Sequence, residues 1–242
     1  MDNKIQSQLR TLKLYNAFLT LIIFCFIFFS FKDSGKDKFD EISVEKLNIV
    51  DKDGNIKMII AGKGRLPGSI MNGKEFSKQT RGSGMIFYNE DGDECGGYQW
   101  GCDKDGSAGA IFAFDQYKQD QIVSLNYQET EGALGDLTKK RYAGLSINPQ
   151  PTNIALDVLV AKYEEARKIP DSALRAETLK TLNNYYTCNS LFVGKRSNDD
   201  MGLFIYDANL NTRLKLYTDK NGNPKLQFLD SMGIVIYSLP NK

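Results

Sequence analysis

An apolar run close to the N-terminus constrains this chain more than any other stretch of it. Residues 14–31, LYNAFLTLIIFCFIFFSF, contain no Asp, Glu, Lys or Arg, although 25% of the whole chain is charged. About 20 predominantly apolar residues are enough for an α-helix to cross a bilayer. No polar face remains, because large apolar residues recur all round the run, among them Phe18, Ile22, Phe26 and Phe29. We therefore expect a transmembrane anchor over residues 14–31.

Two alternatives to an uncleaved anchor fit the residues less well. A cleavable signal peptide has a shorter apolar core, followed by small residues at the cleavage site. Residues 30–34, SFKDS, provide no small-x-small pair. A lipoprotein signal ending at Cys25 would need small residues before the cysteine, where Ile23 and Phe24 are large. These features favour a signal anchor that stays attached to the chain.

Flanking charge does not settle which way the anchor points. Three basic residues precede the run (Lys4, Arg10, Lys13), and four follow it closely (Lys32, Lys36, Lys38, Lys46). That comparison does not favour a cytoplasmic N-terminus, but long domains translocate largely regardless of flanking charge. We expect a cytoplasmic leader over residues 1–13, a linker over residues 32–41 and a domain over residues 42–242 outside the cytoplasm. The expected location is a bacterial inner membrane crossed once, with the domain in the periplasm.

Composition limits what that domain can do. The 31 basic and 30 acidic residues give a net charge of +1, so no electrostatic footprint for nucleic acid is present. Histidine is absent, which excludes Ser-His-Asp and Cys-His catalysis and His-containing zinc sites within the chain. We expect no enzyme activity, no cofactor and no metal.

A recurring turn sequence dominates the chain after the anchor. The pattern [DN]-x-x-G occurs at residues 51–54, 89–92, 103–106, 219–222 and 230–233, with a looser version at residues 207–211. Asp or Asn opens a type I turn with its side chain, and Gly accepts a positive φ at the fourth position. In residues 207–211 an Asn is expected to supply the left-handed residue. The pattern lacks the ligand spacing of an EF-hand, so it indicates hairpins rather than calcium sites.

Apolar residues alternate with polar ones between these turns. This alternation predicts antiparallel strands with one apolar face that is buried and one polar face that is exposed to solvent. Such strands are expected at residues 85–88, 98–102, 110–114, 121–127 and 142–147, after a first hairpin over residues 44–61. The fold class is therefore all-β, a meander closed into a barrel or folded into a sandwich. A small propeller is the alternative.

A helical hairpin is expected to interrupt the strands at about residues 153–187. Apolar residues recur at helical spacing over residues 154–169, where Asn153 caps the start and Pro170 ends the run. Asp171 or Ser172 caps a second helix that runs to about Tyr186. The hairpin is interpreted either as a lid on the β-domain or as an arm that binds a partner.

A polar stretch at residues 114–121, FDQYKQDQ, holds the candidate binding residues. It can hydrogen-bond a glycan, a peptide edge or another subunit, or it can cap the ends of two strands. Arg65 lies in a Gly-rich connection over residues 62–84, and loops of that length are often functional. The candidates are Asp115, Gln116, Tyr117, Gln119, Asp120, Gln121 and Arg65.

Three cysteines follow the anchor. Cys95 and Cys102 are separated by roughly 20 Å if the chain between them is extended, which is too far for a disulfide. We favour unpaired and mostly buried thiols, and a disulfide between Cys102 and Cys188 is the possible pairing that we would test. No C-x-x-C motif is present.

Several stretches together resemble an uncharacterised family of bacterial β-rich, envelope-associated proteins. They include EKLNIVDKDGNIKMII, RLPGSIMNGKEF, GMIFYNEDG, FDQYKQDQ, LFVGK and LQFLDSMGIVI, and they cover most of the chain from Glu45 onward. The resemblance implies no reaction and no catalytic residue.

Two functions from different classes follow from these observations. The first is a non-enzymatic accessory protein, held by lipid at residues 14–31, that docks on a protein partner in the envelope. The second is an envelope glycan-binding or hydrolytic domain that uses Asp115 and Asp120.

Overall fold

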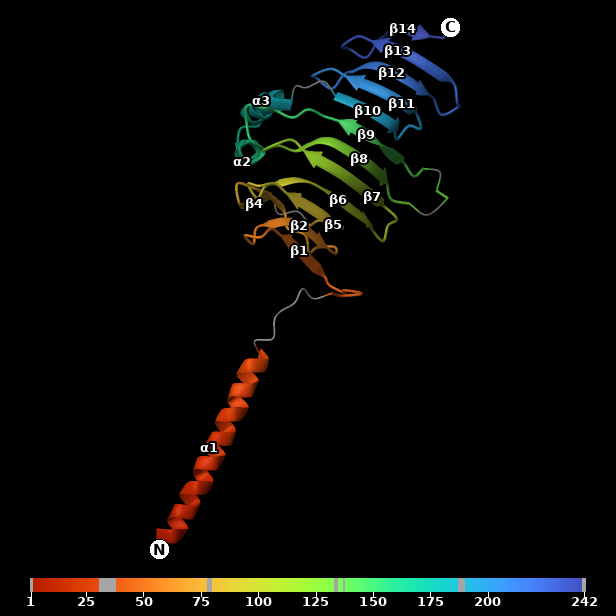
Figure 1. Cartoon of the computed structure of the whole chain (residues 1–242). Helices are drawn as coiled ribbons and strands as arrows, with labels where there is room; N and C mark the ends of the chain where they lie inside the picture. The colour runs from red at the N-terminus through yellow and green to blue at the C-terminus, as the bar shows by residue number, and fades with distance from the viewer. Residues whose placement is uncertain are drawn as a thin grey trace. The chain divides into compact units, whose positions relative to one another are not determined.

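The structure is a computed structural model that describes residues 2–30, 38–77, 80–132, 135–136, 138–186 and 190–240. The chain divides into two compact units, Met1–Ser43 and Val44–Lys242. Each unit is described by itself (Figure 1).

The first unit is built on one long helix, α1 (Asp2–Ser30). Its segment Asn3–Ile27 is long and apolar enough to cross a membrane, with a mean hydropathy of 1.5. Phe18, Ile22 and Phe26 are exposed on the helix, as is Cys25. The predicted apolar helix is confirmed, and it extends back through the leader as well. Such a helix serves as a membrane anchor or as a signal sequence.

The second unit is dominated by one twelve-stranded antiparallel sheet, in which neighbouring strands follow one another along the chain (Figure 1). A separate two-stranded hairpin is inserted in the sequence between β2 and β5, which pair with each other directly. The strands of the large sheet are β1 (Lys46–Val50), β2 (Ile56–Ala61), β5 (Ser83–Tyr88), β6 (Glu94–Cys102), β7 (Ala108–Asp115), β8 (Gln121–Glu129), β9 (Arg141–Ile147), β10 (Ser190–Lys195), β11 (Met201–Tyr206), β12 (Thr212–Thr218), β13 (Pro224–Leu229) and β14 (Val235–Leu239). The small hairpin is β3 (Ser69–Met71) with β4 (Lys74–Ser77).

The all-β meander is confirmed, but the expected closure into a barrel is wrong. The described strands run from β1 at one edge of the sheet to β14 at the other, with no pairing between these two. A sandwich or a propeller is also ruled out for these strands, since all twelve belong to one sheet. The alternation of apolar and polar residues along a strand shows that one face is apolar, but it carries no information about what covers that face.

The predicted turns close the hairpins as expected. In each [DN]-x-x-G turn the glycine N–H donates to the carbonyl of the first residue, as Gly54 does to Asp51 at 3.1 Å and Gly222 to Asp219 at 2.8 Å. Residues 207–211 depart from the expectation, because Leu210 and not an Asn adopts the left-handed conformation, with φ of 61°. Leu210 occupies the position that glycine takes in the other turns. The Gly-rich connection over residues 62–84 contains two short strands, β3 and β4, which the sequence analysis did not identify.

Strand register places apolar side chains on one face of the whole sheet. Directly opposed residues of neighbouring strands share a face, so the pairings define two rows that cross all twelve strands. Apart from Gly96, every position in both rows is Leu, Ile, Val, Met, Phe or Tyr. The first row is Leu47, Ile60, Met85, Tyr98, Phe112, Leu125, Leu145, Val193, Leu203, Leu216, Leu226 and Leu239; the second is Ile49, Met58, Phe87, Gly96, Phe114, Val123, Ile147, Leu191, Ile205, Leu214, Phe228 and Tyr237. We call these two rows the apolar face.

The apolar face is open to solvent among the described residues. Leu125 is 58% exposed and Leu216 is 53% exposed, although both lie near the middle of their strands. Aromatic rings on this face pack against one another, such as Phe112 against Phe114 at a centroid distance of 5.0 Å. The apolar side predicted for each strand is therefore present, and no described element of the second unit covers it.

On the opposite face of the sheet, side chains are buried by contacts with other residues of this chain. Ile86 and Tyr88 are buried there with Leu66 from the β2–β3 connection. Farther along, Phe192 and Phe204 stack at 6.0 Å, and the guanidinium of Arg196 lies 4.8 Å from the ring centroid of Phe204. Phe204 is fully buried as a result.

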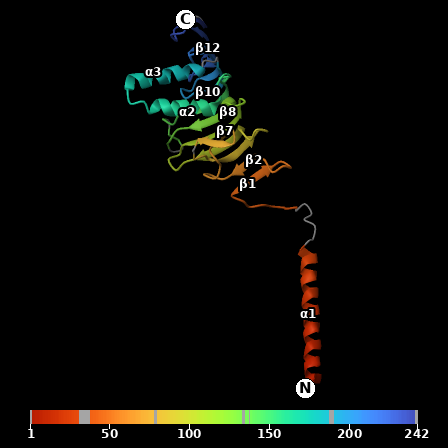
Figure 2. The same cartoon turned by 90° about the vertical axis from the view of Figure 1, so that its left-hand side faces the viewer.

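The predicted helical hairpin is present as α2 (Leu156–Arg167) and α3 (Ser172–Asn183), followed by the short helix η1 (Asn184–Tyr186). The two helices pack on each other through Leu159, Ala166 and Leu182 and project from one side of the sheet (Figure 2). Asp171 caps α3 by accepting from Leu174 N at 2.8 Å. The cap expected at Asn153 is wrong, because α2 begins after Ala155 without a side-chain cap.

Candidate functional site

The polar stretch forms a tight turn between β7 and β8. Gln119 N donates to Gln116 O at 2.8 Å, and Gln116 N donates to Asp120 O at 3.0 Å. Lys118 has a positive φ of 57°, which is uncommon for a residue with a side chain. Contacts on several sides hold this turn in place.

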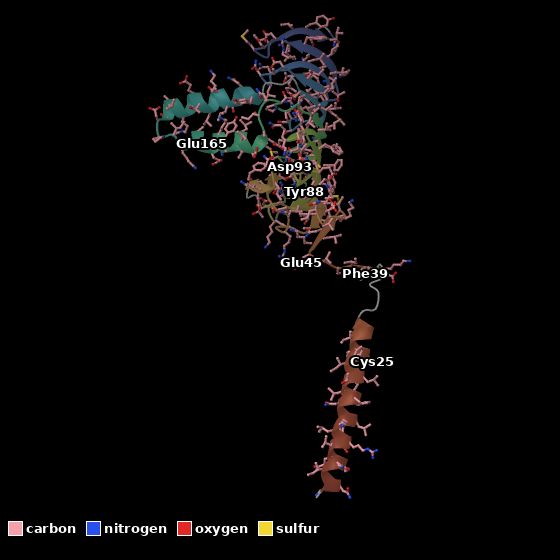
Figure 3. The ribbon with its side chains drawn as sticks, turned by 60° about the vertical axis from the view of Figure 1, so that its left-hand side comes forward. Cys25, Phe39, Glu45, Tyr88, Asp93 and Glu165 are labelled. Carbon is pink, nitrogen blue, oxygen red and sulfur yellow. The ribbon has the colours of Figure 1, made fainter. Side chains whose placement is uncertain are left out.

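Lys118 joins the turn to two other elements. Its Nζ lies 2.5 Å from Oδ2 of Asp93, whose side chain is almost completely buried, and 2.9 Å from Oδ1 of Asn72 in the β3–β4 turn. The ion pair with Asp93 raises the pKa of Lys118. Asn72 N in turn donates to Asp93 Oδ1 at 2.6 Å. Figure 3 shows Asp93 on the side of the sheet from which the helices project.

The two glutamines of the turn hold the chain that leads into α2. Gln116 accepts from Gln150 N at 3.1 Å and donates to Gln150 O at the same distance. Gln119 donates through Nε2 to Ile154 O. The backbone completes the attachment, since Leu156 N donates to Lys118 O at 2.9 Å. The turn therefore fixes the position of the first residues of α2.

Two of the candidate residues have other roles. Tyr117 donates to Asp91 Oδ2 at 2.8 Å, and this bond raises the pKa of Tyr117 while it lowers that of Asp91. Arg65 pairs with Glu45 in front of β1, and its side chain is largely exposed. Neither Tyr117 nor Arg65 lines the pocket described next.

A pocket of about 530 Å³ lies between α2, the β3–β4 hairpin and the ends of β6, β7 and β8. We call it the α2 pocket. Asp115, Gln119, Asp120 and Gln121 are the candidate residues that line it. The other lining residues are Ser69, Ile70, Met71, Phe76, Arg81, Glu94, Gln99, Leu156, Val160, Glu164 and Arg167.

A buried ion pair forms part of the pocket wall. Arg81 binds Glu94 through two bonds, Nη1 to Oε1 at 2.9 Å and Nη2 to Oε2 at 2.7 Å, and it also donates to Ser69 Oγ at 2.9 Å. The Arg81 side chain is only 7% exposed. Bidentate pairing of this kind fixes both groups in orientation.

Asp115 has an unusual environment for a carboxyl group. Burial, together with the negative charges of Glu94 and Asp120, raises the pKa of Asp115 to about 7. Its Oδ1 atom is buried and accepts no hydrogen bond from the described residues. Gln119, with a residue exposure of 3%, likewise has a buried Oε1 without a donor in the described part of the chain. Two buried acceptors thus lack partners at one pocket.

Sequence reasoning found the acidic part of this site but missed the rest. Arg81 and Glu94 lie outside the polar stretch, and the α2 residues that line the pocket look like ordinary surface positions of an amphipathic helix. The one available signal was the spacing of Leu156, Val160, Glu164 and Arg167, which places them on one side of α2.

The remaining sequence expectations concern cysteines and metals. Cys102 is exposed at the end of β6, whereas Cys188 lies outside the described residues. Within the described ranges, no group of three or more His, Cys, Asp or Glu side chains is arranged to hold a metal ion.

No protein-family model, curated protein or solved structure matches this chain.

Proposed function

We propose that this chain is a membrane-tethered, non-enzymatic accessory protein of the bacterial cell envelope. Its second unit, Val44–Lys242, which we call the β-unit, docks on another protein. In this proposal α1 is an uncleaved anchor in the inner membrane, and the β-unit is periplasmic. The bound partner presents an apolar protein surface to the apolar face of the sheet. The exposed apolar face is the observation that carries the proposal.

The size of the apolar face fits a protein partner. Twelve strands spaced by about 4.8 Å span about 53 Å, and two rows of side chains cover about 13 Å, so the face measures roughly 700 Å². Stable protein interfaces bury about 800 Å² on each partner. Monomeric soluble proteins rarely expose a contiguous apolar patch of this size, and such patches mark interaction sites.

Charged side chains border the apolar face at the ends of β8 and β9. Beyond Tyr127 on the same face of β8, Glu129 pairs with Lys139 at 2.5 Å and with Arg141 at 3.1 Å. The bond from Lys139 contributes most to lowering the pKa of Glu129 to about 2. An apolar centre with a charged rim is the usual anatomy of a protein interface. Contact with acyl chains would instead place these ionised groups against hydrocarbon.

Affinity purification of the full-length chain in mild detergent tests the docking. Leu216→Lys places a charge in the apolar face, and Gln128→Lys places one on the opposite face of β8, where the residue is exposed. A different protein should co-purify in stoichiometric amount with the parent chain and with Gln128→Lys, and it should be lost with Leu216→Lys. A partner that is retained by Leu216→Lys would refute docking through this face.

Protease digestion tests the placement. Protease added outside intact spheroplasts should digest the β-unit, and detergent should be needed to extract the full chain from membranes. Complete protection of the β-unit would reverse the proposed orientation, and recovery in the soluble fraction would remove the anchor.

A further inference from the structure

Part of the lining of the α2 pocket is apolar, and the rest is polar or charged. Ile70, Met71 and Phe76 come from the β3–β4 hairpin, and Leu156 and Val160 come from α2. Carboxyl and amide groups from β6, β7, β8 and the β7–β8 turn line most of the remainder, together with Ser69, Arg81 and, from α2, Glu164 and Arg167. Ligand pockets commonly combine apolar walls with a few polar groups that fix orientation, and their volumes are about 300–1,000 Å³. At about 530 Å³ the α2 pocket lies within that range.

The charged groups at the pocket leave an excess of negative charge. Arg81 is engaged by Glu94 through two hydrogen bonds. Arg167 is engaged by Glu164, its neighbour on α2, at 2.6 Å. Asp115 and Asp120 are the two carboxyl groups that remain without a guanidinium partner among the lining residues. A cationic ligand is therefore favoured over an anionic one.

The unpartnered buried atoms specify a ligand that donates hydrogen bonds. Gln119 directs Nε2 to the carbonyl oxygen of Ile154, which can only accept, so its Oε1 must be the free acceptor. Asp115 Oδ1 is the second buried acceptor without a donor. An unpaired buried acceptor is unfavourable, so a donor supplied by a ligand makes binding more favourable.

From these observations we infer that the α2 pocket binds a small organic ammonium ion, a protonated primary amine attached to an apolar body. On binding, the side chains of Asp115 and Gln119 turn so that the ammonium group donates to their oxygens, and the negative charge of Asp115 and Asp120 offsets its positive charge. The apolar body lies against Val160, Leu156 and the hairpin residues. An anionic ligand fits less well, because both guanidinium groups at the pocket are already engaged by carboxylates.

Titration of Asp115 supports this assignment. The groups that face it are Glu94 and Asp120, which raise its pKa, and Arg81, which lowers it, while Glu164 and Arg167 face the pocket from α2. A bound ammonium ion stabilises the ionised carboxyl group, so binding should strengthen as the pH rises through about 7.

Isothermal titration calorimetry of the full-length chain in mild detergent with n-butylammonium as the probe tests the inference. The matched neutral probe is 1-butanol, and N-acetylglucosamine represents a sugar. We expect saturable binding of n-butylammonium with a Kd on the order of 1 mM, as suits a ligand of five heavy atoms. Equal binding of 1-butanol, binding of the sugar alone, or no saturation by n-butylammonium up to roughly 50 mM would each overturn the inference.

Three variants show whether binding takes place in the α2 pocket. Asp115→Asn should weaken n-butylammonium binding by about tenfold or more, since a charge-assisted hydrogen bond is lost. Asp53→Asn removes a carboxylate from the exposed β1–β2 turn and should leave binding unchanged. Val160→Trp fills the pocket from the surface of α2 and should abolish binding even if Asp115→Asn fails to fold. Unchanged binding in Val160→Trp would place the ammonium ion elsewhere.

Discussion

The Nζ atom of Lys118 lies 2.5 Å from Oδ2 of Asp93, and that carboxylate side chain is 1% exposed. This ion pair connects the β7–β8 turn to the residue just before β6. Asn72 extends the connection to the β3–β4 hairpin through its bonds to both residues. The two sides of the α2 pocket are thus held together by one buried carboxylate.

Replacing Lys118 with Met should destabilise the fold, because Asp93 would be left buried without its counter-ion. Loss of one partner from a buried ion pair leaves the other charge uncompensated, so we expect the free energy of unfolding to fall below that of the parent chain. Urea unfolding can be followed through the fluorescence of Trp100, the single tryptophan. Lys52→Met in the exposed β1–β2 turn is the control, and an equal effect of both variants would contradict the structural role of Lys118.

Leu210→Gly should stabilise the fold. Leu210 has a φ of 61°, and a left-handed conformation costs a residue with a side chain about 1–2 kcal/mol. Glycine recovers this energy but loses about 0.5–1 kcal/mol through its greater freedom in the unfolded chain, so the net gain is about 0.5–1 kcal/mol. The same unfolding measurement checks it, with Leu214→Gly in β12 as a destabilising comparison. A loss of stability in Leu210→Gly would show that its side chain makes a compensating contact.

Asp115 should make stability fall as the pH rises. Its pKa is about 7 in the folded chain against an ordinary value of 3.8, so between these values the folded chain holds more protons than the unfolded chain. The free energy of unfolding then decreases with pH across that window. Asp115→Asn should remove this component, so that the variant gains stability relative to the parent chain from pH 4 to pH 7. An unchanged difference between variant and parent at both pH values would contradict the raised pKa.

The two faces of the sheet should respond differently to truncation. Leu125→Thr on the apolar face should change the free energy of unfolding by less than about 0.5 kcal/mol, because Leu125 is 58% exposed. Phe204→Ala on the opposite face should cost about 3–5 kcal/mol, because Phe204 is fully buried between Phe192 and Tyr217. Thermal unfolding of the full chain measures both. A large loss in Leu125→Thr would mean that the apolar face is already covered.

Local features were predictable from the sequence because their causes are local. Asp51 with Gly54 specifies a turn without reference to the rest of the chain, and Asp171 caps α3 in the same way. Whether the sheet closes depends on what packs against its apolar face. The alternation of apolar and polar residues around Leu203 or Leu216 is the same in a barrel and in an open sheet. The α2 pocket was hidden for a similar reason, since Arg81 and Asp115 are 34 positions apart in the sequence and meet only in the folded chain.

Site-specific photocrosslinking in intact cells tests the central claim, docking through the apolar face, most directly. A photoreactive amino acid at position 125 lies on the apolar face, and one at position 128 lies on the opposite face of the same strand. The account predicts a discrete adduct with a different protein from position 125 and none from position 128. Adducts from position 125 only with lipid or only with a second copy of this chain would contradict the claim.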